Sequence, residues 1–192
     1  MGSGHPLHLM KIPFLLFICL LFGLGCHTNR GLPPPPPTVE DADQRCYPNG
    51  SLSAADRKKI YPFNAAAQVV VIAFDSALGK APLENNRLVA AQTKERIALS
   101  DAQIDRLTDI LYNYGYSSST RLIEQTVSGC YYPRHALLFE DKQGKVLSYL
   151  ELCLECRRIK TSLPEKSTGV FCEGKYALLE AFFREVGVRY FK

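Results

Sequence analysis

Two apolar segments joined by a short polar connection constrain the fold of this chain more strongly than any other feature. The segments are 135–141 and 146–152, and Lys142-Gln143-Gly144-Lys145 lies between them. Two such runs separated by a glycine-containing turn are typical of a β-hairpin. A turn centred on Gln143-Gly144 pairs His135 with Leu152 and Asp141 with Val146. The pattern therefore predicts antiparallel strand pairing in this part of the chain.

Other apolar patterns place strands and helices on both sides of this hairpin. The stretch 68–74 is continuously apolar after Gln68 and rich in β-branched residues, which favours a strand buried on both faces. A Ser-x-x-Gln capping box at Ser100 predicts a helix over 101–113. Apolar residues at helical spacing predict a second helix, and they are Tyr176, Leu179, Phe182, Phe183 and Val186.

Shorter patterns complete the expected order of elements. The run 87–91 fits a strand or a short helix, and we take it as a strand. Further strands are expected over 122–127 and 188–191, with loops over 117–120 and 163–169. Strands, helix, strands and helix in this order predict an α+β domain with a mainly antiparallel sheet and two or three helices packed on one face.

The composition fits one folded domain, which we expect over 46–192. The chain has 192 residues, of which 46% are apolar and 22% charged, so it can bury a core. Its net charge is only +4, and its longest run of basic residues is Arg57-Lys58-Lys59. A nucleic-acid partner is therefore not expected.

The first 25 residues have the pattern of an export signal. Lys11 is their only charged residue, and an apolar run follows it from Ile12 to Phe22. This run is shorter than the roughly 20 residues that a membrane-spanning helix needs. Gly25-Cys26 resembles the end of a bacterial lipobox, in which the cysteine is acylated and becomes the new N-terminus. Gly23 departs from the usual Leu of that pattern, and a plain secretory signal is the alternative.

Residues 26–45 are expected to form a tether. They include five consecutive prolines, Pro33 to Pro37, which favour a stiff polyproline II spacer. A spacer of this kind would hold a folded domain away from a membrane surface. If the sorting rule for bacterial lipoproteins holds, His27 rather than Asp after Cys26 implies the outer membrane. The domain would then face the periplasm or the cell surface.

The cysteines and one histidine form the main candidate site. Cys19 would leave with the signal and Cys26 would be lipidated. The remaining cysteines are Cys46, Cys130, Cys153, Cys156 and Cys172. Their number is odd, so at least one thiol is left out of intramolecular disulfides. The predicted hairpin register brings Cys130, His135, Cys153 and Cys156 to its open end.

Three interpretations of this group stay open. Structural disulfides would join Cys130 to Cys153 or Cys156, with another involving Cys46 or Cys172. Alternatively, the four residues at the open end supply the ligand types, and the Cys-x2-Cys spacing, of a tetrahedral zinc site. Cys153-Leu154-Glu155-Cys156 could also be a redox pair, which a helix after Cys156 would favour and a loop would disfavour.

The sequence carries no recognisable set of catalytic residues. His135 is the only histidine within 46–192, and no nucleophile motif surrounds it. No glycine-rich phosphate loop or dinucleotide fingerprint occurs. We assign no catalytic residue and expect no cofactor other than zinc.

Cys130-Tyr131-Tyr132-Pro133-Arg134-His135 and the later Cys153-Leu154-Glu155-Cys156 carry a family resemblance. They are similar to a group of uncharacterised bacterial secreted proteins and lipoproteins. These share a Cys-Tyr-x-Pro-Arg-His hairpin with a Cys-x-x-Cys end. The resemblance covers residues 100–190 and is specific over 130–156. It implies no activity and no catalytic residue.

Together these features predict a cell-envelope lipoprotein with a binding or structural domain rather than an enzyme. Its partners would be the membrane, through the lipid anchor, and a protein or a small ligand. The alternative is a thiol-redox or zinc-binding envelope protein that uses Cys130, His135, Cys153 and Cys156.

Overall fold

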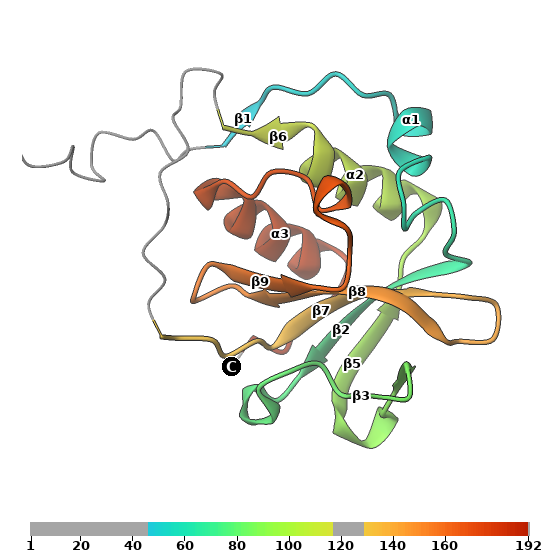
Figure 1. Cartoon of the computed structure of the whole chain (residues 1–192). Helices are drawn as coiled ribbons and strands as arrows, with labels where there is room; N and C mark the ends of the chain where they lie inside the picture. The colour runs from blue at the N-terminus through green and yellow to red at the C-terminus, as the bar shows by residue number, and fades with distance from the viewer. Residues whose placement is uncertain (1–45, 117–128, 192) are drawn as a thin grey trace, which may run out of the picture. The chain divides into compact units, whose positions relative to one another are not determined.

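A five-stranded antiparallel sheet lies at the centre of the described residues, which are 46–116 and 129–191 of this computed structural model (Figure 1). The strand order is β5-β2-β7-β8-β9. The strands are β2 Gln68–Phe74, β5 Thr93–Ala98, β7 His135–Glu140, β8 Val146–Cys153 and β9 Arg158–Thr161. The α+β class with a mainly antiparallel sheet is confirmed.

Two helices cover one face of the sheet, as predicted (Figure 1). They are α2 Asp101–Tyr112 and α3 Glu173–Glu185, and the short α1 Ala54–Lys58 packs against α2. Ser100 forms the predicted capping box with Gln103, which explains where α2 begins. The pair β1 Tyr47–Pro48 and β6 Tyr114–Gly115 brings the N-terminal end of the described residues beside the end of α2.

The sheet is buried on both faces because a small layer covers the side opposite α2 and α3. That layer contains the 3-10 helix η3 Ser76–Leu78 and the hairpin of β3 Leu83–Glu84 and β4 Arg87–Leu88. Alternate residues of β2 enter the two cores: Val69, Val71 and Ala73 face the helices, whereas Val70, Ile72 and Phe74 face the small layer. The predicted strand 68–74, buried on both faces, is confirmed.

The predicted hairpin is formed by β7 and β8, with one change at its turn. His135 pairs with Leu152 as expected, but Glu140 rather than Asp141 pairs with Val146. The Asp141 carboxylate accepts hydrogen bonds from the amides of Gln143 and Lys145, and Gly144 adopts a positive φ of 72°. These bonds enclose a five-residue loop, which shifts the register at the end of the hairpin.

Several shorter predictions need correction. Only Arg87–Leu88 of the run 87–91 is a strand, because the 3-10 helix η4 Ala90–Gln92 follows it. Residues 188–191 are not a strand; Glu95 accepts hydrogen bonds from the backbone amides of Arg189 and Tyr190 instead. The expected loop 163–169 contains the 3-10 helix η5 Glu165–Ser167. The expected loop 117–120 and strand 122–127 lie outside the described residues.

The N-terminal predictions also fall on residues outside the described ones. These are the signal over 1–25, the lipidation of Cys26 and the tether over 26–45. Within 46–116 and 129–191, no helix combines the length and apolar character needed to cross a bilayer. All described residues belong to one compact unit.

Candidate functional site

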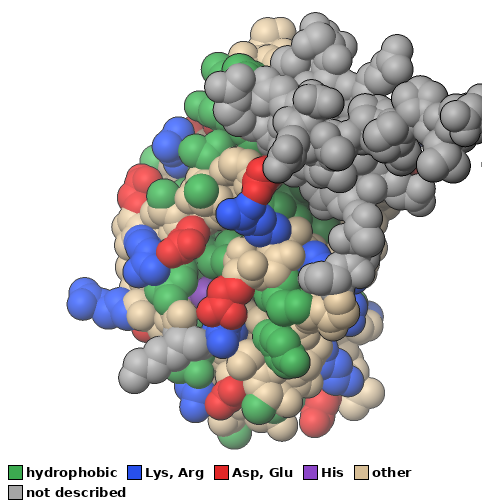
Figure 2. All heavy atoms as spheres, turned by 90° about the vertical axis from the view of Figure 1, so that its left-hand side faces the viewer, with side chains coloured by type: hydrophobic (Ala, Val, Ile, Leu, Met, Phe, Trp, Pro, Cys, Tyr) green, Lys and Arg blue, Asp and Glu red, His purple; other side chains and the backbone are tan. Residues whose placement is uncertain are grey.

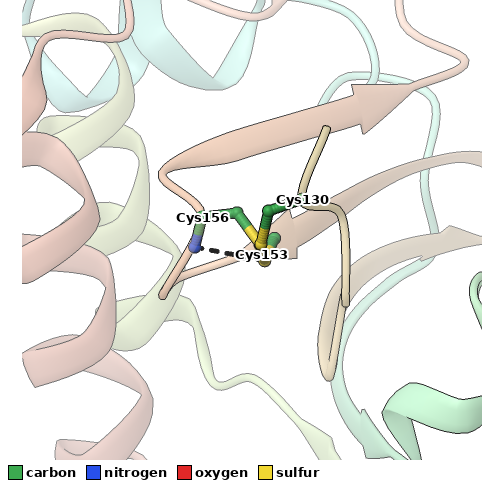
Figure 3. A group of neighbouring side chains, drawn as sticks. All are labelled: Cys130, Cys153 and Cys156. Atoms are coloured by element: carbon green, nitrogen blue, oxygen red, sulfur yellow. Dashed lines mark hydrogen bonds between the residues drawn. A yellow bond between two sulfur atoms is a disulfide. The ribbon is translucent and has the colours of Figure 1, made fainter. Parts of the chain in front are cut away.

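Three cysteines converge where β8 ends and β9 begins. Cys153 is the last residue of β8, Cys156 lies in the turn that leads to β9, and Cys130 precedes β7. Their sulfur atoms all lie within 4.8 Å of one another. Figure 3 shows the three side chains pointing toward a common centre. We call these three residues the cysteine cluster.

The cysteine cluster contains one disulfide and one free thiol. Cys153 and Cys156 are bonded to each other, and Cys130 is free. The backbone N–H of Cys156 donates a hydrogen bond to the Cys153 sulfur at 3.2 Å (Figure 3). Cys153 is 1% exposed, whereas Cys130 and Cys156 are partly exposed. The structure therefore does not contain the Cys130–Cys153 or Cys130–Cys156 disulfide that the sequence interpretation considered.

Contacts from β8 and β9 position the segment that carries Cys130. Arg158 donates a hydrogen bond from Nη1 to the carbonyl oxygen of Cys130 at 3.0 Å. The neighbouring Tyr131 donates its hydroxyl to the buried carboxylate of Glu151 at 3.0 Å, and Lys160 lies over its ring. Burial, followed by the nearby Glu151 charge, raises the pKa of Tyr131 far above its usual range. Tyr131 therefore stays protonated and keeps Cys130 beside the turn.

Ion pairs partly neutralise the basic residues near the cysteine cluster. Arg134 pairs with Glu155 at 2.8 Å, and Arg157 pairs with Glu173 at the start of α3. Figure 2 shows the side of the molecule on which the β8–β9 turn lies in Figure 1. Where the described residues are visible there, basic, acidic and apolar side chains are interspersed.

His135 lies outside the cysteine cluster, contrary to the interpretation that grouped it with the cysteines. Its Nε2 forms a hydrogen bond with the carbonyl oxygen of Tyr190 at 2.8 Å, and its ring packs against Phe183 and Phe191. Because side chains alternate along a strand, His135 and its partner Leu152 face α3, whereas Cys153 faces away. Burial lowers the pKa of His135 below its usual value. This histidine therefore holds the C-terminal residues Tyr190 and Phe191 against the sheet.

The other two cysteines of the described residues form a separate disulfide. Cys46, at the N-terminal end of the described residues, is bonded to Cys172, the N-cap residue of α3. The two positions are 126 residues apart in the sequence, and Cys172 is completely buried. This bond therefore joins the N-terminal end of the described residues to the start of α3.

A β-strand follows the Cys153–Cys156 turn. Arg157 takes a positive φ of 50°, its amide bonds to Leu154, and β9 then begins at Arg158. The redox interpretation depended on a helix after Cys156, whose N-terminus would stabilise a thiolate. The turn and strand found there favour the disulfide or metal interpretations over a thioredoxin-like redox pair.

The sequence interpretation missed the burial of the cation Lys175. Its Nζ donates a hydrogen bond to the carbonyl oxygen of Leu111 at 2.7 Å, and the residue is fully buried. Burial lowers its pKa to about 7. Its position in the sequence could have indicated this burial. Lys175 lies four residues before the core residue Leu179, on the same face of α3.

No protein-family model, no curated protein and no solved structure matches this chain. The resemblance to envelope proteins with a Cys-Tyr-x-Pro-Arg-His hairpin therefore stays a prediction. Among the described residues, the cysteine cluster is a group that could hold a metal ion. It is the candidate site that we take forward.

Proposed function

We propose that this protein is a lipid-anchored cell-envelope protein whose folded domain binds a soft metal ion, zinc, at Cys130, Cys153 and Cys156. The observation that carries the proposal is that the three sulfur atoms lie within 4.8 Å of one another. Thiolate sulfur binds zinc at about 2.3 Å, so three sulfurs around one ion lie roughly 4 Å apart. The Cys153 and Cys156 sulfurs are bonded to each other in this structure, so the three sulfurs can reach that spacing once this disulfide opens.

Zinc would bind the reduced form of the cluster. A dithiol reductant must first open the Cys153–Cys156 disulfide and is itself oxidised to a disulfide. Zinc would then displace the protons of the three thiols, which pass to water. The N–H of Cys156 that now points at the Cys153 sulfur would stabilise a thiolate there. Three protein ligands leave the fourth tetrahedral position for water or for a ligand from outside, which is the arrangement of an open zinc site.

A direct test is the zinc content of the full-length chain after reduction. The chain is reduced with dithiothreitol, exchanged into zinc-containing buffer without oxygen, desalted and analysed for metal. We expect about one zinc per chain, and less than a fifth of that in Cys130→Ser. Cys26→Ser is the matched control, because it removes a cysteine outside the cluster and should keep the metal. A wild-type chain without zinc, or Cys130→Ser with full zinc, would overturn the proposal.

The anchor is supported by the order Lys11, apolar run, Gly25-Cys26 and proline spacer. It is tested separately in bacteria fed a fatty-acid analogue that can be labelled. We expect label on the wild-type chain in the membrane fraction and none on Cys26→Ser. Equal label on both chains would show that Cys26 is not the acylated residue.

A further inference from the structure

We propose that the oxidised cysteine cluster is a thiol–disulfide exchange centre, in which Cys130 takes over the bond to Cys156 and releases Cys153. The Cys130 thiol loses its proton to water, and its sulfur attacks the sulfur of Cys156. A new Cys130–Cys156 bond forms, the Cys153–Cys156 bond breaks, and the Cys153 thiolate takes a proton from water. One disulfide and one thiol are present before and after, so no oxidant or reductant is consumed.

The spacing of the sulfur atoms supports this exchange. A disulfide bond is about 2.05 Å long, and the Cys130 sulfur lies within 4.8 Å of both bonded sulfurs. A side-chain movement of roughly 3 Å would bring it to bonding distance. The backbone is already held in place, because Arg158 bonds the Cys130 carbonyl and Tyr131 bonds Glu151. Attack within a preorganised site proceeds far faster than attack by a thiol free in solution.

The hydrogen bond inside the turn selects the sulfur that leaves. The N–H of Cys156 points at the Cys153 sulfur at 3.2 Å and would stabilise the negative charge that develops when the bond breaks. Cys153 is the most buried of the three residues, so the partly exposed Cys156 sulfur is the more accessible one for attack. The two partly exposed residues, Cys130 and Cys156, therefore end up bonded to each other, and the thiol moves to the buried position.

This inference shares its three residues with the proposed metal site but does not depend on metal binding. It concerns the oxidised, metal-free chain, whereas zinc requires the reduced one. The two can therefore fail independently: zinc binding without exchange would overturn only this inference, and exchange without zinc binding would overturn only the metal proposal.

The experiment maps the disulfides of the folded, oxidised full-length chain in the presence of a zinc chelator. Acid stops exchange by protonating thiols, pepsin cuts the chain, and mass spectrometry identifies the linked peptides. We expect a Cys130–Cys156 linkage in at least roughly a tenth of the chains beside Cys153–Cys156, a ratio set by exchange equilibrium. The Cys46–Cys172 linkage should stay complete and serves as the internal control.

Two variants make the assignment sharper. Cys153→Ser leaves the two sulfurs that the exchange joins, and after treatment with oxidised glutathione it should contain a Cys130–Cys156 disulfide. Cys130→Ser removes the attacking thiol and should contain only Cys153–Cys156 within the cluster. A wild-type chain with Cys153–Cys156 alone, together with two free thiols in Cys153→Ser, would overturn the inference. A Cys130–Cys153 linkage in place of Cys130–Cys156 would overturn the assigned leaving group.

Discussion

The two disulfides of this domain differ in what they can do. Cys46–Cys172 closes a loop between positions 126 residues apart, and neither of its cysteines belongs to the cysteine cluster. Cys153–Cys156 spans three positions and lies beside the free thiol of Cys130. The chain-entropy model gives about 5 kcal/mol of stabilisation for the long loop and about 2 kcal/mol for the short one. The first is suited to stabilising the fold, whereas the second is placed for chemistry.

The largest effect is expected from opening the long bridge. Cys46→Ala should lower the free energy of unfolding by about 5 kcal/mol, because the unfolded chain regains the loop entropy. Cys156→Ser opens the short bridge and should cost about 2 kcal/mol. Urea unfolding monitored by circular dichroism measures both values. Equal losses in the two variants would contradict the division of roles between the disulfides.

A pH-dependent effect is expected beside the long bridge, at Lys175. The folded-state pKa is about 7, well below the ordinary value of 10.5, because the ammonium group is buried. Between these values the unfolded chain binds more protons than the folded chain. The free energy of unfolding should therefore rise with pH, by roughly 3 kcal/mol from pH 7 to 9.5. Lys175→Met should remove this rise, which urea unfolding across that pH range would show. A variant with the same pH slope as the wild type would exclude Lys175 as its origin.

A smaller loss of stability, with no loss of metal, is expected at His135. Its ring fills space beside Phe183 and Phe191, so His135→Ala should lower the free energy of unfolding by about 2 kcal/mol. Because burial lowers the pKa of His135, the unfolded state binds more protons in acid than the folded state does. The wild type should therefore lose stability as the pH falls below 6.5, and the variant should lose less. Zinc content should stay at the wild-type value, and its loss would place His135 in the metal site.

The smallest effect is expected at Arg158, which supports the cluster without belonging to it. Arg158→Gln removes the hydrogen bond to the Cys130 carbonyl and loosens the segment that carries the thiol. Zinc affinity of the reduced chain should fall roughly tenfold, as is usual for residues that orient a metal ligand. Competition with a zinc-binding dye gives the affinity. An unchanged affinity would show that Cys130 does not depend on this bond.

Local patterns predicted the central part of the fold. The pairing of His135 with Leu152 follows from alternating segments of matched length, and the capping box at Ser100 marks the start of α2. The register at the turn could not be predicted, because it depends on the side chain of Asp141 binding two backbone amides. β9 was missed because its sequence, Arg158–Thr161, is largely polar, and it lies at the edge of the sheet.

The candidate site was predicted only in part. The hairpin pattern brought Cys130, Cys153 and Cys156 to the same end, where the structure places them. It could not show that the chain turns back between Leu154 and Arg157, which returns Cys156 to Cys153. Nor did it show that the predicted second helix, α3, packs against His135 and keeps this residue from the cysteines. The position of Cys156 beside Cys153 and the separation of His135 from the cysteines both depend on tertiary contacts, which a local sequence pattern does not show.

The most direct test of the metal proposal compares the two cysteine pairs within one sample. The full-length chain is mildly reduced, so that the short Cys153–Cys156 bridge opens, and alkylated with and without zinc before peptide mapping. We expect zinc to protect Cys130, Cys153 and Cys156 together, with Cys46 and Cys172 unlabelled in both samples. Equal labelling of the three cluster cysteines with and without zinc would contradict a metal centre at this position.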